Sequence, residues 1–135
     1  MTENKNSKDI SVLDKYFPLF DESRVSKDAR KELISLFSED ITFVLNGHEK
    51  HGMKEWENFL DLIFTNNTDI KQMYEGWEFN KETQKYETRW AVCGKSQNNK
   101  VYTQVGIDIA QLDENNKIKY LANIPEDSAL FDSYK

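Results

Sequence analysis

The segment 101–124 constrains the fold most, because it has the pattern of a long β-hairpin. Its β-branched residues share one parity, as the alternation of a pleated strand requires: Val101, Val105, Ile107 and Ile109. A polar turn follows at 113–117 and contains Asn115-Asn116. Asparagine tolerates positive φ, which tight hairpin turns need. The chain resumes a strand pattern from Lys117, so the segment predicts two antiparallel strands.

The opposite parity of the first strand of this hairpin carries a single acid. It reads Tyr102, Gln104, Gly106, Asp108, Ala110 and Leu112. Asp108 therefore stands between two residues with almost no side chain. This spacing predicts a pocket with an acid in its wall. The alternative is a solvent-facing acid on an edge strand, since most aspartates are exposed.

Three helices are predicted in the first half of the chain. The first is capped by Ser7 or Asp9, and Pro18 predicts a kink or an end near Phe17. The second begins after Ser26. The helices bury stripes at helical spacing: Leu13, Tyr16, Phe17 and Phe20 in the first, Ala29, Leu33, Leu36 and Phe37 in the second, and Met53, Trp56, Phe59, Leu60, Ile63 and Phe64 in the third.

Strand patterns dominate the second half. A short strand is predicted at 41–45, and long strands are predicted at 70–79 and 86–96, before the hairpin of 101–124. The turn at 97–100 contains another Asn pair. The order α-α-β-α-β-β-β-β predicts an α+β fold rather than alternating α/β. With no repeat or linker, we expect a disordered tail at 1–6 and one domain at 7–135.

Composition excludes several classes of partner. The formal net charge is −6, which argues against nucleic acid and against an anionic membrane surface. No apolar run is long enough to span a membrane, and residues 1–10 lack the apolar region of a secretory signal. The chain has one cysteine, Cys93, so it forms no intramolecular disulfide and a cytoplasmic location is expected. No cofactor-binding or phosphate-binding motif is visible.

The order of elements resembles the nuclear-transport-factor-two-like superfamily, which includes SnoaL-like cyclases and ketosteroid isomerases. Three stretches carry the resemblance: 36–43 at the helix-to-strand entry, His51-Gly52 before the third helix, and the turn 112–118. The resemblance covers nearly the whole chain. It implies a bent, mainly antiparallel sheet wrapped around the helices as a cone, with a mostly apolar internal pocket.

Two residues extend the resemblance to the ketosteroid isomerases. Tyr16 and Asp108 fall where those enzymes place a tyrosine and a neutral aspartic acid that donate hydrogen bonds to an oxyanion. The resemblance implies these roles here; Tyr16 is alternatively a core tyrosine. The isomerase base is missing, because its positions match Val44-Leu45-Asn46. A base would come from Asp40, Glu75 or Glu78, or from ionised Asp108.

The sequence supports two functions of different classes. The first is a pocket for a small apolar carbonyl compound, used for isomerisation, cyclisation or dehydration without a cofactor. The second is a non-catalytic dimeric or ligand-binding module whose pocket is vestigial. Besides Tyr16 and Asp108, we expect these residues to line the pocket: Phe20, Trp56, Phe59, Trp77, Trp90 and Tyr102.

Two further expectations concern metal and self-association. His48 and His51 have H-x-x-H spacing, but they lie on a loop and supply too few ligands for a zinc site. If Asp108 points inward, the row from Val101 to Ile109 points outward as an uncharged apolar ridge. A second copy of the sheet, packed face to face, is the simplest cover for such a ridge. We therefore expect a homodimer.

Overall fold

The computed structural model describes residues 2–127, with side chains from residue 6 onward. The last part of the predicted domain, 128–135, lies outside the described residues. The elements are, in chain order, α1 Thr2–Leu13, α2 Tyr16–Ser23, α3 Lys27–Ser35, β1 Phe37–Leu45, β2 His48–His51, α4 Met53–Asn66, β3 Asn67–Tyr74, β4 Glu78–Asn80, β5 Lys85–Ser96, β6 Val101–Leu112 and β7 Ile118–Pro125. Residues 2–6, predicted as a disordered tail, form the start of α1.

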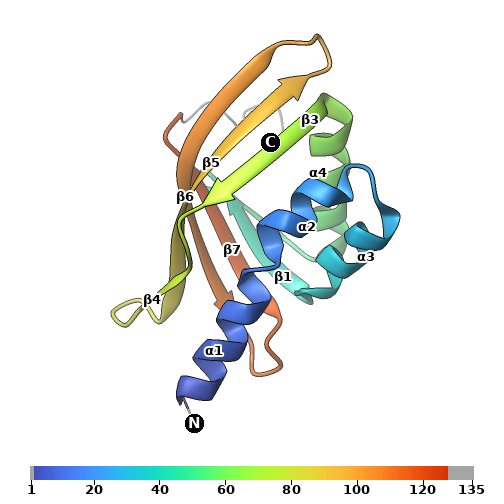
Figure 1. The fold of residues 1–135 in the computed structure, drawn as a ribbon. Helices are drawn as coiled ribbons and strands as arrows, with labels where there is room; N and C mark the ends of the chain where they lie inside the picture. The colour runs from blue at the N-terminus through green and yellow to red at the C-terminus, as the bar shows by residue number, and fades with distance from the viewer. Residues whose placement is uncertain (1, 128–135) are drawn as a thin grey trace.

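The strands form one mixed sheet in the order β2-β1-β7-β6-β5-β3, and β4 pairs with β5. β1 runs parallel to β7, and the other pairs are antiparallel. The sheet is strongly bent, and α2, α3 and α4 lie together on one side of it (Figure 1). The predicted α+β cone architecture is therefore confirmed.

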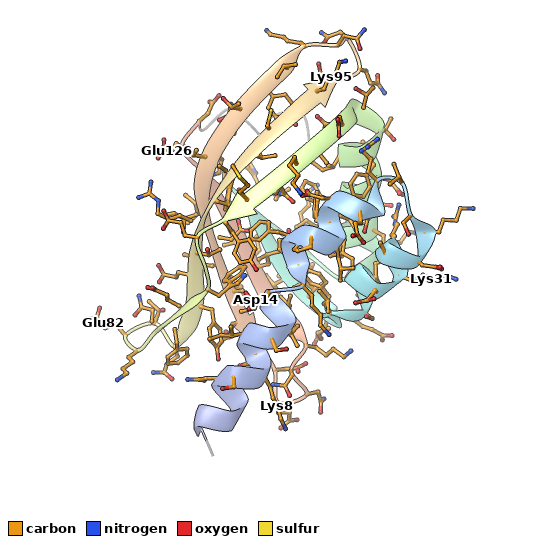
Figure 2. All side chains as sticks on the ribbon, in the orientation of Figure 1. Lys8, Asp14, Lys31, Glu82, Lys95 and Glu126 are labelled. Atoms are coloured by element: carbon orange, nitrogen blue, oxygen red, sulfur yellow. The ribbon has the colours of Figure 1, made fainter. Side chains whose placement is uncertain are left out.

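The helical segment at the N-terminus is broken by Pro18, one turn earlier than predicted. Pro18 has no N–H to donate to the carbonyl of Asp14, and its ring crowds that carbonyl. α1 accordingly ends at Leu13, and α2 begins at Tyr16. The Tyr74 hydroxyl lies 3.3 Å from the freed Asp14 carbonyl oxygen and 3.1 Å from Asp14 Oδ1, so it donates to this pair. Figure 2 labels Asp14, which lies at the break between α1 and α2.

The boundaries of α3 correct one prediction and confirm another. Ser26 caps the helix, because its side chain accepts a hydrogen bond of 3.1 Å from the Ala29 N–H. The helix ends at Ser35, however, so Leu36 and Phe37 do not continue its apolar face as predicted. Phe37 instead begins β1, where its ring is buried. An apolar residue is compatible with both structures, and packing decides between them.

Two strand predictions are also corrected. The predicted loop after Asn46-Gly47 contains β2, which pairs with β1 as a hairpin. Asn46 and Gly47 have φ values of 48° and 88°, the conformation of a tight turn whose twist matches the flanking strands. The strand predicted at 70–79 is interrupted after Tyr74. Gly76 has φ of 138°, and its N–H is bound to Thr88 Oγ at 3.1 Å.

The hairpins on both sides of β6 follow the sequence prediction. In each predicted turn one asparagine takes positive φ, 66° at Asn99 and 59° at Asn116. These turns bring β5, β6 and β7 together as adjacent antiparallel strands. The inner face of β6 therefore lies in the middle of the sheet, opposite the helices (Figure 1).

Candidate functional site

Asp108 lies on the inner face of β6 and has no exposed surface. The alternation of the strand places Gly106 and Ala110 on the same buried face, while Val105 and Ile107 are exposed on the other. The inward orientation predicted for Asp108 is therefore confirmed, and the alternative of a solvent-facing acid is wrong. The apolar ridge beside it points outward, as predicted.

The space beside Asp108 is filled by protein. A Cβ atom on Gly106 would lie 2.5 Å from Trp90 Cζ2 and 2.6 Å from the Ile124 carbonyl oxygen. Trp90 is the partner of Gly106 on β5, and its indole covers the glycine. The small residue therefore accommodates an aromatic ring, where the sequence predicted open space around the acid.

Burial raises the pKa of Asp108 to about 8. The nearby indole N–H of Trp90 acts against burial and lowers the pKa of Asp108. The Trp90 N–H and the Asp108 carboxyl do not, however, meet the geometry of a hydrogen bond. Neither carboxyl oxygen of Asp108 has a hydrogen-bond partner in the described part of the chain. The direction agrees with the neutral acid that the resemblance to ketosteroid isomerases implies at this position. Asp108 is therefore a neutral acid at pH 7, and it can donate a hydrogen bond.

Tyr16 opens α2 and lies among aromatic rings of the core. Its ring makes edge contacts with Phe17 and Phe37, at centroid distances of 4.9 and 5.9 Å. Burial raises the pKa of the Tyr16 hydroxyl well above its usual value, and the nearby charges of Asp108 and Asp21 raise it further. The phenol therefore stays protonated and remains a hydrogen-bond donor at all ordinary pH values.

A pocket of about 70 Å³ lies between α2, α4 and the inner face of the sheet. The residues that line it are Tyr16, Phe20, Phe59, Ile63, Ile70, Gln72, Trp90, Val92, Tyr102 and Asn123. A water needs roughly 10–15 Å³ measured in this way, so the space holds several waters. Aromatic rings, among them Tyr16, Phe20, Phe59 and Trp90, form much of its lining.

The structure divides the predicted pocket residues into two groups. Those that line the pocket are Tyr16, Phe20, Phe59, Trp90 and Tyr102. Trp56 and Trp77 do not line it. Trp56 is buried against Phe37 and Phe43, and Trp77 stacks on Phe17 at 6.0 Å. Asp108 also lies behind the pocket surface, although its strand runs beside the pocket.

Tyr102 is held in place at the pocket by a glycine and an asparagine. Its ring lies against Gly94, where a Cβ atom would collide with it. Its hydroxyl donates to Asn67 Oδ1 at 2.6 Å, and Asn67 Nδ2 donates to the Ile63 carbonyl at 2.8 Å. This chain of bonds connects β6 to the end of α4 and fixes one wall of the pocket.

Two polar pocket residues, Gln72 and Asn123, were missed from the sequence. Gln72 lies on β3, and Asn123 lies on β7 directly opposite Asp108. The side-chain oxygen of each is buried and has no hydrogen-bond partner among the described residues. Counting outward from the 113–117 turn would have placed Ala122 opposite Asp108, so the sequence held no signal for Asn123.

Asp21, which follows Phe20 on α2, was also missed. Its Oδ2 accepts the Gln72 backbone N–H at 2.9 Å, while its Oδ1 is buried without a hydrogen-bond partner in the described region. Burial raises the pKa of Asp21 to about 6, against opposing effects of the Gln72 hydrogen bond and of Lys71. An acid with this pKa is mostly ionised at pH 7 and can take up a proton about one pH unit below neutrality.

The carboxylates considered from sequence as bases lie elsewhere. Asp40, Glu75 and Glu78 are exposed, and none lines the pocket. His48 and His51 are exposed on β2. Within residues 2–127, no group of three or more His, Cys, Asp or Glu is placed to hold a metal ion. None of the helices in this range has the length and apolar character to cross a membrane.

Comparison with solved structures identifies the family. An NTF2-like protein of unknown function from Exiguobacterium sp. 255-15 is 55% identical, with a TM-score of 0.84 over 86% of this chain and 98% of that chain. The chain belongs to the NTF2-like family. No family profile matches this NTF2-like chain, and a search of curated proteins finds no match.

More distant structures share the NTF2-like fold. A Mycobacterium tuberculosis protein crystallised with estradiol-17beta-hemisuccinate is 9% identical, with a TM-score of 0.71 over 86% of this chain and 92% of that chain. The epoxide hydrolase/cyclase-like enzyme SalBIII is 14% identical, with a TM-score of 0.71 over 91% of this chain and 94% of that chain. At these identities the likeness concerns the fold alone.

Proposed function

We propose that this protein binds a small, largely apolar organic molecule through a carbonyl, enol or phenol oxygen, with the Tyr16 hydroxyl as a direct hydrogen-bond donor and neutral Asp108 as a donor behind the pocket surface. The observation that carries the proposal is the buried acid: Asp108 has no exposed surface and no hydrogen-bond partner among the described residues. A polar group left unpaired in a core is costly, so its retention points to a role in recognition. The steroid ester bound by the Mycobacterium tuberculosis relative is consistent with this class of ligand.

The reaction that fits these donors is isomerisation, cyclisation or dehydration without a cofactor. In each case an oxygen gains negative charge, and donors already in place stabilise it. Asp21 is our proposed proton acceptor, since its pKa of about 6 suits proton transfer near neutral pH. Asp21 does not itself line the pocket, but it accepts a hydrogen bond from the backbone of Gln72, which does, so it lies directly behind the pocket wall.

The size of the pocket favours a second candidate, a non-catalytic module. An engineered cavity of about 150 Å³ binds benzene, whereas this pocket measures only about 70 Å³. An aromatic ligand therefore has to displace a side chain or extend through the pocket mouth. If the rings do not move, the pocket holds only water, and the domain acts through its outer surface.

Two fluorinated probes separate these functions. 4-Fluorophenol and fluorobenzene differ by one hydroxyl, and ¹⁹F NMR reports the binding of each. We expect 4-fluorophenol to bind more tightly, and we expect Tyr16→Phe to weaken it about threefold to tenfold, the value of one hydrogen bond. Fluorobenzene binding should not respond to that substitution. Absence of binding by both probes, or equal affinity for both, would contradict the proposal.

Catalysis is tested by proton exchange. Enolisation of cyclohexanone in D₂O replaces its α-protons by deuterium, and ¹H NMR follows the loss of signal. A catalytic pocket should accelerate this exchange above the buffer rate. Binding of 4-fluorophenol without any acceleration would support the non-catalytic, ligand-binding alternative.

A further inference from the structure

The connection between Asp108 and the pocket runs through the neighbouring strand. Asp108 does not line the pocket, whereas Asn123 does. The two residues are direct partners in the antiparallel pairing of β6 and β7. Side chains at such positions share one face of the sheet, with Cβ atoms about 4.5–5.5 Å apart. Asn123 therefore lies between the buried acid and the space that a ligand would occupy.

The hydrogen-bonding capacity of this pair is incomplete. Both carboxyl oxygens of Asp108 and the side-chain oxygen of Asn123 are buried without a partner among the described residues. Thr88, the partner of Asp108 on the other side, is already engaged. Its hydroxyl donates to the Arg89 carbonyl and accepts from the Gly76 N–H, both at 3.1 Å. A proton on one carboxyl oxygen of Asp108 turns that oxygen into a donor, which can satisfy Asn123 Oδ1.

We propose that Asn123 contacts the ligand and that the acid of Asp108 fixes the orientation of its amide by donating to Oδ1. The amide nitrogen then faces the pocket and donates to the ligand oxygen. Tyr16, a second hydrogen-bond donor, lines the same pocket. Two donors in the lining of one pocket select an oxygen with available lone pairs, such as a ketone, an enolate or a phenolate. This inference rests on the proposed function, because it assumes a ligand in this pocket.

The groups that face Asp108 are consistent with a neutral acid. The Tyr16 hydroxyl on α2 is coupled to Asp108 through its charge and stays protonated. The Trp90 indole on β5 is neutral. It lowers the pKa of Asp108, but by less than burial raises it. With the pKa of Asp108 at about 8, its proton is in place at pH 7. Asp108 thus acts through Asn123 as a positioning residue.

The hydrogen bond between the two residues is tested without a ligand. ¹³C NMR titration of the Asp108 carboxyl is compared between the natural protein and Asn123→Leu, which keeps the volume and excludes water. If the acid donates to Oδ1, loss of the acceptor destabilises the neutral form, and the pKa of Asp108 should fall by about one pH unit. An unchanged or raised pKa would overturn the proposal. Gln104→Leu removes an amide from the same face of β6 and should leave the titration unchanged.

The contact with the ligand is tested with 4-fluorophenol. Asn123→Leu should weaken its binding about tenfold, with fluorobenzene unaffected. In the natural protein, the side-chain ¹⁵N–¹H signals of Asn123 should shift with 4-fluorophenol and not with fluorobenzene, which tests the contact even if the variant fails to fold. A lowered Asp108 pKa with unchanged binding would refute the contact. If 4-fluorophenol does not bind the natural protein at all, the proposed function fails together with the contact, while the titration still decides the hydrogen bond.

Discussion

Replacing Asp108 with asparagine is expected to change how the stability of the fold depends on pH. The acid is neutral in the folded protein up to a pKa of about 8, whereas in the unfolded chain it ionises near its ordinary value of 3.8. Ionisation above that value therefore stabilises only the unfolded chain. The contribution of Asp108 to the free energy of unfolding is fully present below about pH 4, and it falls as pH rises to about 8.

The magnitude follows from the two pKa values. Each tenfold change in proton affinity corresponds to about 1.4 kcal/mol, so the loss between pH 4 and pH 8 is on the order of 5 kcal/mol. Between pH 5 and pH 7 the natural protein should lose about 3 kcal/mol through this residue. Asp108→Asn has the same size and cannot ionise, so this loss should be absent from the variant.

Urea unfolding at pH 5, 6, 7 and 8 measures the effect as a difference between the two proteins. The stability of Asp108→Asn relative to the natural protein should rise by about 1.4 kcal/mol for each pH unit from pH 5 to pH 7, and by less toward pH 8, where the folded protein also begins to ionise. Glu82→Gln is the matched control, because Glu82 is exposed at the far tip of the β4–β5 hairpin (Figure 2). If the free energies of unfolding of Asp108→Asn and of the natural protein changed with pH in parallel, the conclusion that Asp108 is neutral in the folded protein would be refuted.

Three further predictions test other parts of the structure. Gly106→Ala should destabilise the fold by about 3 kcal/mol in guanidinium denaturation, because the new Cβ meets Trp90 and fixed backbone atoms; a loss below about 1 kcal/mol would contradict this packing. Asp21→Asn should abolish any accelerated α-proton exchange of cyclohexanone, and the natural rate should rise through pH 6; an unchanged rate would exclude Asp21 as the base. Ile107→Lys should convert a dimer to a monomer in sedimentation velocity, whereas Val25→Lys, an exposed apolar control outside the sheet, should not; a natural protein that is already monomeric would refute the dimer.

The inner and outer faces of β6 could be predicted from sequence because alternation is a local property. Asp108 and Ile107 occupy opposite parities, and one buried face is enough to fix both orientations. The turn conformations were predictable for a similar reason, since asparagine tolerates positive φ at Asn99 and Asn116. These features depend on a few neighbouring residues and not on packing across the sheet.

The partners of Asp108 could not be predicted, because they depend on cross-strand register. Leu112 pairs with Ile118, and a regular hairpin extended from that pair would place Asp108 opposite Ala122. A bulge between Gln111 and Leu112 shifts the register by one residue and brings Asn123 opposite the acid. The packing at Gly106 could not be predicted for the same reason. Only the register between β5 and β6 places Trp90 beside Gly106, where its ring fills the space that a side chain would take.

The position of Tyr16 follows from a break in the helix and from contacts at both ends of α2. Pro18 has no N–H to donate to the Asp14 carbonyl. The helix therefore breaks after Leu13, and Tyr16 starts a new helix. The Tyr74 hydroxyl, at the end of β3, binds Asp14 before the helix, and the Gln72 backbone N–H, also on β3, binds Asp21 further along it. Hydrogen bonds therefore connect the chain to β3 on both sides of Tyr16. The break at Pro18 and these two contacts thereby fix the helix that carries Tyr16 into the pocket lining.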